Sequence, residues 1–308
     1  MTTLKCFTFS SALFASFMLL TVSIDAHDTS RESEDTWLQA VHEAWAKEDE
    51  AYKTSPTSPL AGLSRYEISE TAPVYFEKKD TGIEWSLDKA DHTLFYLVNE
   101  GEQWTWGALG REVRVSREDS DVPSGAVLNA GDQLKAGRFS VAFYPSANSV
   151  TVLVFDPDTQ RIKNFKSLDR YEANHRFALM ATIERFETPE QLEMITARQQ
   201  FKKQYRYAKL HFEIDGTPLE LVAFKSVLEG EGSDGLFIPF ADKTSGKHTY
   251  GGGRYLMVKE PPEGNKVLVD FNLVTNPLCS YADIYNCILP PQENRLRVPI
   301  LAGVKKYH

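Results

Sequence analysis

Two cysteines near the C-terminus are the residues whose spacing most restricts their chemistry. Cys279 and Cys287 lie within the stretch "DFNLVTNPLCSYADIYNCILPPQENRL", and a bond between them would close a loop of nine residues. The chain-entropy model gives a loop of that size about 2.5 kcal/mol of stabilisation. Zinc would need two further ligands, and no histidine lies nearby in the sequence, whereas a redox pair more often has Cys-x-x-Cys spacing. We therefore predict a disulfide, with a metal site or a reactive thiol pair as the alternatives.

A glycine-rich segment upstream, "FADKTSGKHTYGGGRYL" at residues 240–256, has the residue types of an anion site. It is not a P-loop, because Ala241 stands where the first glycine is required and His248 follows the lysine. The backbone N–H groups of glycines 251–253 can form a concave nest for an anion, with Arg254 as its charged partner. The alternative is a glycine-rich hairpin in which Arg254 pairs with a buried aspartate.

The polar residues of these two segments support two different functions. In the first, a buried polar network lines a pocket for a small anionic or carbohydrate ligand, in a binding or structural module of the cell envelope. In the second, Asp242 and Asp270 are the acid and base of an envelope hydrolase, and Tyr250 and Arg254 stabilise charge. We favour binding or structure, because the chain has no Gly-x-Ser-x-Gly and no His-Glu-x-x-His motif. We predict no cofactor and no metal. The candidate ligand-binding residues are Asp242, Thr244, Tyr250, Arg254, Asp270, Asn272 and Asn294.

Strands are the elements that we expect to position these residues. Short β-branched and aromatic runs separated by Gly, Pro, Asn and Asp predict an N-terminal β region over residues 72–157. A second series predicts a C-terminal β domain over residues 165–308, with a tight hairpin turn at Asp215-Gly216. The segment 188–207 is ambiguous, since its start has the residues of a helix N-terminus but a pair of long strands also fits.

One helix is predicted, over residues 33–53. Its aromatic residues, Trp37 and Trp45 among them, fall near one face, and Pro56 prevents its continuation. We expect that face to dock on a sheet rather than to bind a ligand. The predicted fold is therefore mainly β: an N-terminal helix, then two antiparallel β regions of sandwich or barrel type, with a loop-rich, disulfide-stapled C-terminal segment.

The N-terminus has the pattern of a signal peptide. Lys5 precedes an apolar run at residues 12–24, and small residues lead to a cleavage point after Ala26. The apolar run is shorter than the roughly 20 residues of a membrane-spanning helix. We expect residues 1–26 to be removed, the mature chain to be periplasmic or secreted, and no transmembrane segment to remain. The net charge of −9 argues against nucleic acid as a partner. None of these patterns predicts an oligomeric state.

The C-terminal motifs resemble a bacterial and archaeal family known as domain of unknown function 1684. The resemblance rests on "FADKTSGKHTYGGGRYL" and "VLVDFNLVTNPLCSYADIYNCILPPQENRLRVPILAGVK", and it is most specific over roughly the last 75 residues. The matching positions are Asp242, Thr244, Ser245, Gly246, Thr249, Tyr250, Gly251, Gly253, Arg254, Asp270, Phe271, Asn272, Asn276, Pro277, Cys279, Tyr281, Cys287, Leu289, Pro290, Pro291, Glu293 and Asn294.

The resemblance implies a fold but no activity, because the family has none assigned. It favours paired strands for the ambiguous segment 188–207. Other members keep the two cysteines without an export signal, which supports the metal and thiol alternatives. This chain departs from the family pattern at Ile288, where proline is usual, and at Val304, where glutamate is usual. The missing glutamate weakens a catalytic role for an acid near the end of the chain.

Overall fold

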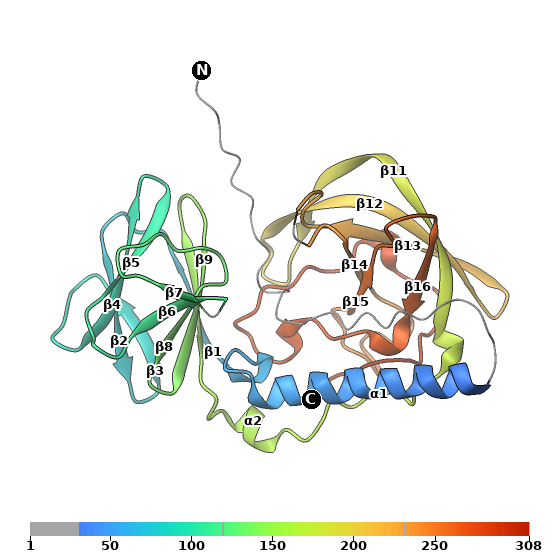
Figure 1. The fold of residues 1–308 in the computed structure, drawn as a ribbon, viewed down its shortest axis with the longest axis horizontal. Coiled ribbons are helices and arrows are strands. Elements are labelled where there is room, and N and C mark those ends of the chain that lie inside the picture. The colour runs from blue at the N-terminus through green and yellow to red at the C-terminus, as the bar shows by residue number, and fades with distance from the viewer. Residues whose placement is uncertain (1–30, 119, 231, 308) are drawn as a thin grey trace. The chain divides into compact units, whose positions relative to one another are not determined.

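The computed structural model describes residues 31–118, 120–230 and 232–307, with side chains from residue 34 onward (Figure 1). The predicted signal peptide, residues 1–26, lies outside the described residues. The chain divides into two compact units. The first contains Glu50–Phe165, and the described part of the second contains residues 31–49 and 166–307.

The first unit contains two antiparallel sheets that share one hydrophobic core. Phe76 and Phe95 stack with their ring centroids 4.4 Å apart in the smaller sheet, and Phe143 of the larger sheet meets Phe95 edge-on at 5.9 Å. This packing of two sheets through interdigitated aromatic rings is that of a β-sandwich. The larger sheet has the order β1 (Gly62–Ile68), β10 (Val150–Phe155), β9 (Phe139–Pro145), β8 (Gln133–Ala136), β6 (Arg114–Arg117), β7 (Ser120–Val122). The smaller has the order β3 (Gly82–Ser86), β2 (Val74–Lys79), β4 (Thr93–Glu100), β5 (Gln103–Ala108).

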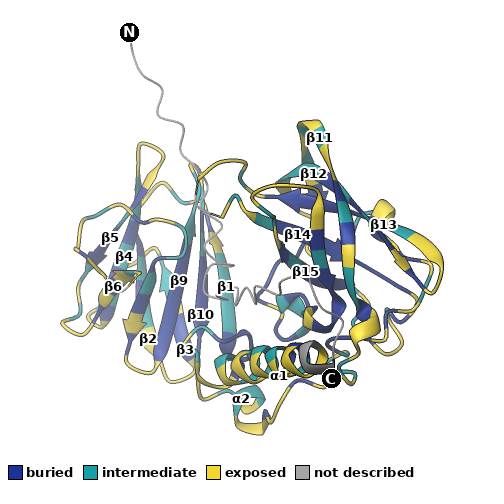
Figure 2. Ribbon diagram, turned by 45° about the vertical axis from the view of Figure 1, so that its right-hand side comes forward, coloured by how far each residue is buried: buried dark blue, intermediate teal, exposed yellow. Residues whose placement is uncertain are grey.

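The second unit is built on one six-stranded antiparallel sheet that curves into a nearly closed barrel. Its core lies inside that curve, and Figure 2 shows β14 and β15 buried along almost their whole length. The ambiguous segment 188–207 forms strands, as the family resemblance implied. The helix propensity of its first residues does not decide the structure, because the two strands of this hairpin pair with each other along a long antiparallel ladder. The order is β15 (Arg254–Lys259), β14 (Gly235–Phe240), β13 (Thr217–Lys225), β12 (Phe201–Ile214), β11 (Ala178–Ile195), β16 (Lys266–Asp270).

The turn between β12 and β13 has the conformation that its sequence predicts. Asp215 and Gly216 have φ angles of 50° and 74°, and Ile214 pairs with Thr217 across the turn. A two-residue hairpin of this kind requires positive φ at both positions, which Asp-Gly tolerates best.

The N-terminal helix, α1, spans Arg31–Thr54, and it ends before Pro56 as predicted. Its apolar stripe includes Trp37 and Val41, both of which are buried. A shorter helix, α2, spans Gln160–Asn164. Neither helix, among the residues that the structure describes, is long and apolar enough to cross a membrane.

The C-terminal segment after β16 is rich in loops, as expected, but the predicted disulfide is not formed. Three short 3-10 turns, η3 (Phe271–Leu273), η4 (Leu278–Ser280) and η5 (Gln292–Asn294), provide its only regular structure among residues 271–307. Cys279 and Cys287 are free cysteines that lie 3.2 Å apart. A disulfide bond is about 2.05 Å long, so the prediction placed the cysteines together correctly and was wrong about the bond in this structure.

Candidate functional site

Asp242 and Arg254, which the sequence proposed for ligand binding or catalysis, form an ion pair inside the second unit. Arg254 Nη2 lies 2.9 Å from Asp242 Oδ2, and both side chains are 0% exposed. The guanidinium also donates to the carbonyl oxygens of Ile300, Ala302 and Val304. Burial lowers the pKa of Arg254, and the neighbouring Asp242 carboxylate opposes that effect. The pair therefore fastens the last segment of the chain to β15, in the arrangement predicted as the alternative to an anion site.

Asp270 and Asn272 serve a second, separate junction. Trp37 Nε1 of α1 donates to Asp270 Oδ2 at 2.8 Å, and Asn272 donates its backbone and side-chain N–H groups to Asp270 Oδ1. The Asn272 side chain also exchanges hydrogen bonds with the backbone of Asn174. Trp45 donates to the Asn272 carbonyl at 2.9 Å. The two tryptophans thus dock α1 on the end of β16, as expected for that helix face.

Asn294 is fully buried and joins η5 to the sheet. Its side chain accepts from the Val222 N–H at 2.7 Å and donates to the carbonyls of Val222 and Pro239. Thr244 is buried as well, where it bonds Thr249 Oγ1 at 2.8 Å within the glycine-rich loop. Both residues satisfy backbone or loop groups that would otherwise be buried without partners.

Tyr250 lies apart from these residues and contacts the cysteine loop. Its hydroxyl is 3.7 Å from Cys279 Sγ. Burial raises the pKa of Tyr250, and the nearby thiol of Cys279 adds to the shift. The candidate residues therefore occupy several hydrogen-bonded junctions, and neither Asp242 nor Asp270 is exposed to a substrate.

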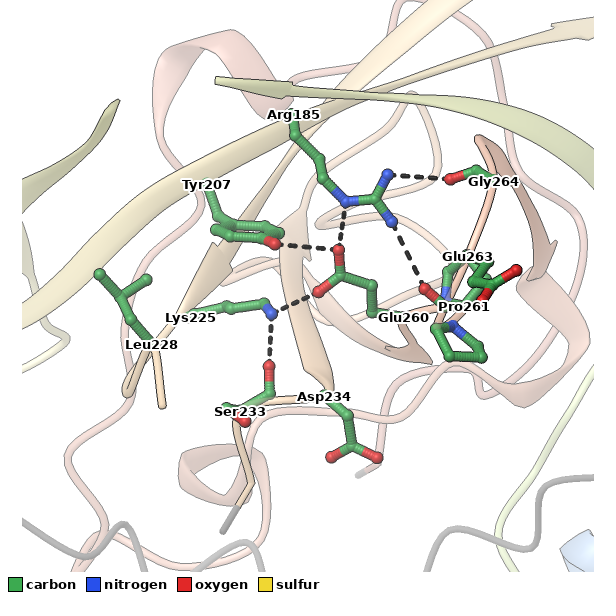
Figure 3. A pocket seen from close by; sticks show the side chains of 11 residues that line it. Arg185, Tyr207, Lys225, Leu228, Ser233, Asp234, Glu260, Pro261, Glu263 and Gly264 are labelled. Carbon is green, nitrogen blue, oxygen red and sulfur yellow. Dashed lines mark hydrogen bonds and ion pairs between the residues drawn. The ribbon is translucent and has the colours of Figure 1, made fainter. Parts of the chain in front are cut away.

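A polar pocket lies elsewhere in the second unit, around Glu260 (Figure 3). It has a volume of about 460 Å³. Arg185 of β11, Tyr207 of β12 and Lys225 of β13 converge on the Glu260 carboxylate from three neighbouring strands. Leu228, Ser233 and Asp234 of the loop after β13, together with residues 260–264, form its rim, and binding residues on a rigid sheet are usually carried on such loops.

The Glu260 carboxylate is fixed by three donors. Oε1 accepts from Arg185 Nε at 2.5 Å and from the Tyr207 hydroxyl at 2.9 Å, and Oε2 accepts from Lys225 Nζ. Burial alone would raise the pKa of Glu260, but the hydrogen bonds from Lys225, Arg185 and Tyr207 outweigh it and hold the pKa below its usual value. Glu260 is therefore an ionised, immobile acceptor at neutral pH.

The two cations of the pocket are also held in place. Lys225 is 4% exposed, donates to the Ser233 carbonyl, and lies 3.9 Å from the centre of the Tyr207 ring. Arg185 donates from Nη1 to the Gly264 carbonyl at 2.9 Å and from Nη2 to the Pro261 carbonyl. Each terminal guanidinium nitrogen has two N–H groups, so a second donor remains on each.

The lining of the pocket contains two cations and three carboxylates. Arg185 and Lys225 are the cations, and Glu260, Asp234 and Glu263 are the acids. Asp234 is also paired with Lys259, with 3.5 Å between Oδ2 and Nζ. Leu228, Pro261 and Pro262 supply apolar surface beside these charges. No sequence motif indicated this site, because Arg185 and Glu260 are 75 residues apart and meet only when the sheet curves.

A second hollow, of about 660 Å³, lies between α1 and residues 167–173. Trp45 and His42 form part of its wall, and Arg170 stacks 5.4 Å from the Trp45 ring. Arg170 is paired there with Glu48 and Asp49. Burial raises the pKa of Glu48, against the effect of Arg170. Trp45 is already hydrogen-bonded there, whereas the Tyr171 hydroxyl and Glu48 Oε1 are buried without a hydrogen-bond partner in the described part of the chain.

Comparison with known proteins agrees with the resemblance seen in the C-terminal motifs. Residues 163–305 match the family described as "Protein of unknown function (DUF1684)". The solution NMR structure of an uncharacterized protein from Haloarcula marismortui is 32% identical in sequence, and the match covers 47% of this chain and 80% of that chain with a TM-score of 0.41. No curated protein matches the chain.

Proposed function

For a chain that belongs, through residues 163–305, to the DUF1684 family of proteins of unknown function, we propose the role of an exported cell-envelope module that binds a neutral carbohydrate in the Glu260 pocket. The family supplies no activity, so the proposal rests on the pocket itself. The observation that carries it is the immobilised Glu260 carboxylate, which three donors hold at an open surface.

The pocket offers donors and acceptors in fixed positions, which is what a sugar requires. Each sugar hydroxyl donates one hydrogen bond and accepts others. Glu260 Oε2 has acceptor capacity beyond its bond to Lys225, and the Arg185 nitrogens have N–H groups beyond those given to the loop carbonyls. Because these side chains already hold one another in place, ligand binding loses little further side-chain conformational entropy. The volume of about 460 Å³ lies within the range of small-molecule sites.

The charge of the lining favours a neutral sugar over an anion. The lining contains two cations and three carboxylates, and both cations already bond Glu260. An anionic ligand would meet Glu263 and Asp234 at the rim, where like charges repel, although Lys259 at 3.5 Å offsets part of the Asp234 charge. Of the two ligand classes that the sequence suggested, small anions and carbohydrates, the carbohydrate fits this pocket better.

The pocket supports binding more than hydrolysis. A glycosidase needs one carboxylic acid that is protonated at working pH, and the hydrogen bonds to Glu260 lower its pKa. The hydrolase alternative built on Asp242 and Asp270 has little support, since Asp242 is sealed against Arg254 and Asp270 is bonded to Trp37 and Asn272.

Export remains part of the proposal. It is supported by the charged, apolar and small-residue regions of residues 1–26. Mass spectrometry of the protein recovered from the periplasm tests export: we expect a mature N-terminus at His27, and an intact Met1 would contradict export with cleavage.

Calorimetric titration with four sugars tests the ligand class. Cellotriose, maltotriose and fully N-acetylated chitotriose are the neutral probes, and trigalacturonic acid is the anionic one. We expect at least one neutral probe to bind and the anionic probe not to bind. The double variant D234N/E263Q removes two rim charges, so it should bind the anionic probe more tightly than the wild type does. Absence of binding by every neutral probe, or preference of the wild type for the anion, would contradict the proposal.

A further inference from the structure

The cysteine loop carries chemistry that the carbohydrate pocket does not use. Cys279 and Cys287 lie 3.2 Å apart, and the Cys279 backbone N–H donates to Cys287 Sγ at 3.1 Å. Cys279 is partly exposed, whereas Cys287 is 8% exposed. One thiol is therefore accessible to a small reagent, and the other lies directly behind it.

We propose that this pair is a site of reversible oxidation by peroxides, in which Cys279 is the reacting thiol and Cys287 the resolving thiol. Peroxide is the oxidant class that fits, because a half-buried sulfur is accessible to a molecule of two oxygen atoms and poorly accessible to a folded protein. The proposal is independent of the pocket around Glu260.

The surroundings of the pair favour the thiolate at Cys279. The hydrogen bond from the Cys287 thiol is the main cause that lowers the pKa of Cys279 to about 7, with a further contribution from the Tyr250 hydroxyl and against the opposing effect of burial. The same contact, together with burial, raises the pKa of Cys287. Since the thiolate is the nucleophile in thiol oxidation, reaction should begin at Cys279.

Few other ionisable groups influence this thiolate. Lys202 donates from Nζ to the Asn286 carbonyl at 2.8 Å and favours the charged form of Cys279. Tyr255 is buried next to Cys287 and donates to the Ile288 carbonyl. Asp283 is exposed, and it raises the pKa of Tyr250 slightly. After the Cys287 thiol, the Tyr250 hydroxyl is therefore the side chain that most favours the Cys279 thiolate.

Metal binding explains the pair less well. Within the part of the chain that the structure describes, no three residues among histidine, cysteine, aspartate and glutamate are grouped to hold a metal ion. Two sulfur ligands alone leave half of a tetrahedral zinc site empty. The geometry therefore points to thiol redox chemistry.

The reaction proceeds in two balanced steps. The Cys279 thiolate attacks one oxygen of hydrogen peroxide, the O–O bond breaks, and the hydroxide that leaves takes up a proton, which gives a sulfenic acid and water. The Cys287 sulfur then attacks the Cys279 sulfur, its thiol proton passes to the departing hydroxyl, and the S–O bond breaks as the S–S bond forms. Two thiols are oxidised by two electrons, and one peroxide becomes two waters. The sulfurs must approach from 3.2 Å to about 2.05 Å, a movement within the reach of side-chain rotation.

Peptide mass mapping of the reduced full chain after peroxide treatment tests the proposal. Trypsin cleavage after Lys266 and Arg295 leaves both cysteines in one peptide, so Cys6 does not interfere. We expect this peptide to lose two hydrogens on oxidation and to regain them with a thiol reductant. In Cys287→Ser, dimedone should trap a sulfenic acid on Cys279, and in Cys279→Ser it should leave Cys287 unlabelled.

Two results would overturn the proposal. One is a wild-type peptide whose thiols remain unmodified at peroxide concentrations that oxidise glutathione. The other is equal dimedone labelling of Cys287 in Cys279→Ser, which would remove the assigned order of the two thiols. Because the wild-type measurement needs no substitution, the proposal stays testable even if one variant fails to fold.

Discussion

Arg254 and Asp242 form a completely buried ion pair, with 2.9 Å between Nη2 and Oδ2 and 0% of either side chain exposed. Nη1 and Nη2 of Arg254 also donate to carbonyls of residues 300–304, whereas its Nε is buried without a hydrogen-bond partner among the residues that the structure describes. One guanidinium thus joins β15, the loop of Asp242 and the end of the chain. A buried charge of this kind is tolerated only when it is paired and hydrogen-bonded. The pair is thus a structural junction, although its residue types also suit a ligand site.

Replacing Arg254 by alanine should destabilise the protein strongly. The substitution leaves the Asp242 carboxylate buried without its counterion and three carbonyls without their donor, and such losses cost about 3–5 kcal/mol. Urea denaturation followed by circular dichroism measures the change. The matched control is Arg176→Ala, because Arg176 forms an exposed pair with Asp215 and should cost less than about 1 kcal/mol. Similar losses from both substitutions would contradict the structural role of Arg254.

Gly303→Ala should be more costly than the same change at Gly216. Both glycines have positive φ, 69° and 74°, so alanine is strained at either position. At Gly303 an added Cβ also meets the Phe271 carbonyl oxygen at 2.6 Å, whereas at Gly216 the nearest atom is 3.9 Å away. We expect a loss of about 1–2 kcal/mol for Gly216→Ala and a larger one for Gly303→Ala. Thermal melting of the two variants measures the difference, and equal melting temperatures would contradict the close packing at Gly303.

The Glu260 cluster should make stability depend on pH in the acidic range. The pKa of Glu260 is lower in the folded protein than the ordinary value of 4.5. The stabilisation that the ionised Glu260 provides is therefore complete above pH 4.5, and it is lost as the pH falls through the folded pKa. The difference in melting temperature between wild type and Glu260→Gln should therefore shrink from about pH 6 to about pH 3. Glu220→Gln, on the exposed surface of the same sheet, is the control for the loss of one carboxylate outside the cluster. If the difference in melting temperature between wild type and Glu260→Gln grows as the pH falls, the prediction is contradicted.

Tyr250→Phe should weaken the reactivity of Cys279 without altering the fold. The Tyr250 hydroxyl lies 3.7 Å from Cys279 Sγ and lowers the thiol pKa, so its removal should raise that pKa from about 7. The rate of alkylation by iodoacetamide as a function of pH measures this, and its midpoint should move to higher pH. Tyr205→Phe, which removes an exposed hydroxyl bonded to Gln191, should leave the midpoint unchanged. An unchanged midpoint in Tyr250→Phe would show that Tyr250 has no positioning role.

The strands could be predicted from the sequence because their alternation and turn residues are local. The hairpin at Asp215-Gly216 and the N-terminal helix follow from such signals. The residues at the start of segment 188–207 suggested a helix, but the pairing between β11 and β12 decides the structure there. That pairing joins residues too far apart in the sequence to be seen in a local pattern. The resemblance to the family corrected this point.

The candidate residues were only partly predictable. Asp242, Arg254 and Asn294 were expected to share one polar network, but the structure places Asn294 at a junction separate from the Asp242–Arg254 pair, and composition does not reveal that all three are sealed by hydrogen bonds. The proximity of the two cysteines followed from their short separation, while the absence of a bond did not. The Glu260 pocket could not be predicted, since its residues come from strands that only the curvature of the sheet brings together.

Calorimetric titration of wild type and Glu260→Gln with the neutral trisaccharide that binds best tests the central claim most directly. Glu260→Gln removes the charge that holds Arg185, Tyr207 and Lys225 in position, so binding should weaken at least tenfold, or about 1.4 kcal/mol. Glu220→Gln should bind as the wild type does, and circular dichroism confirms that both variants are folded. Equal dissociation constants for wild type and a folded Glu260→Gln would contradict the account.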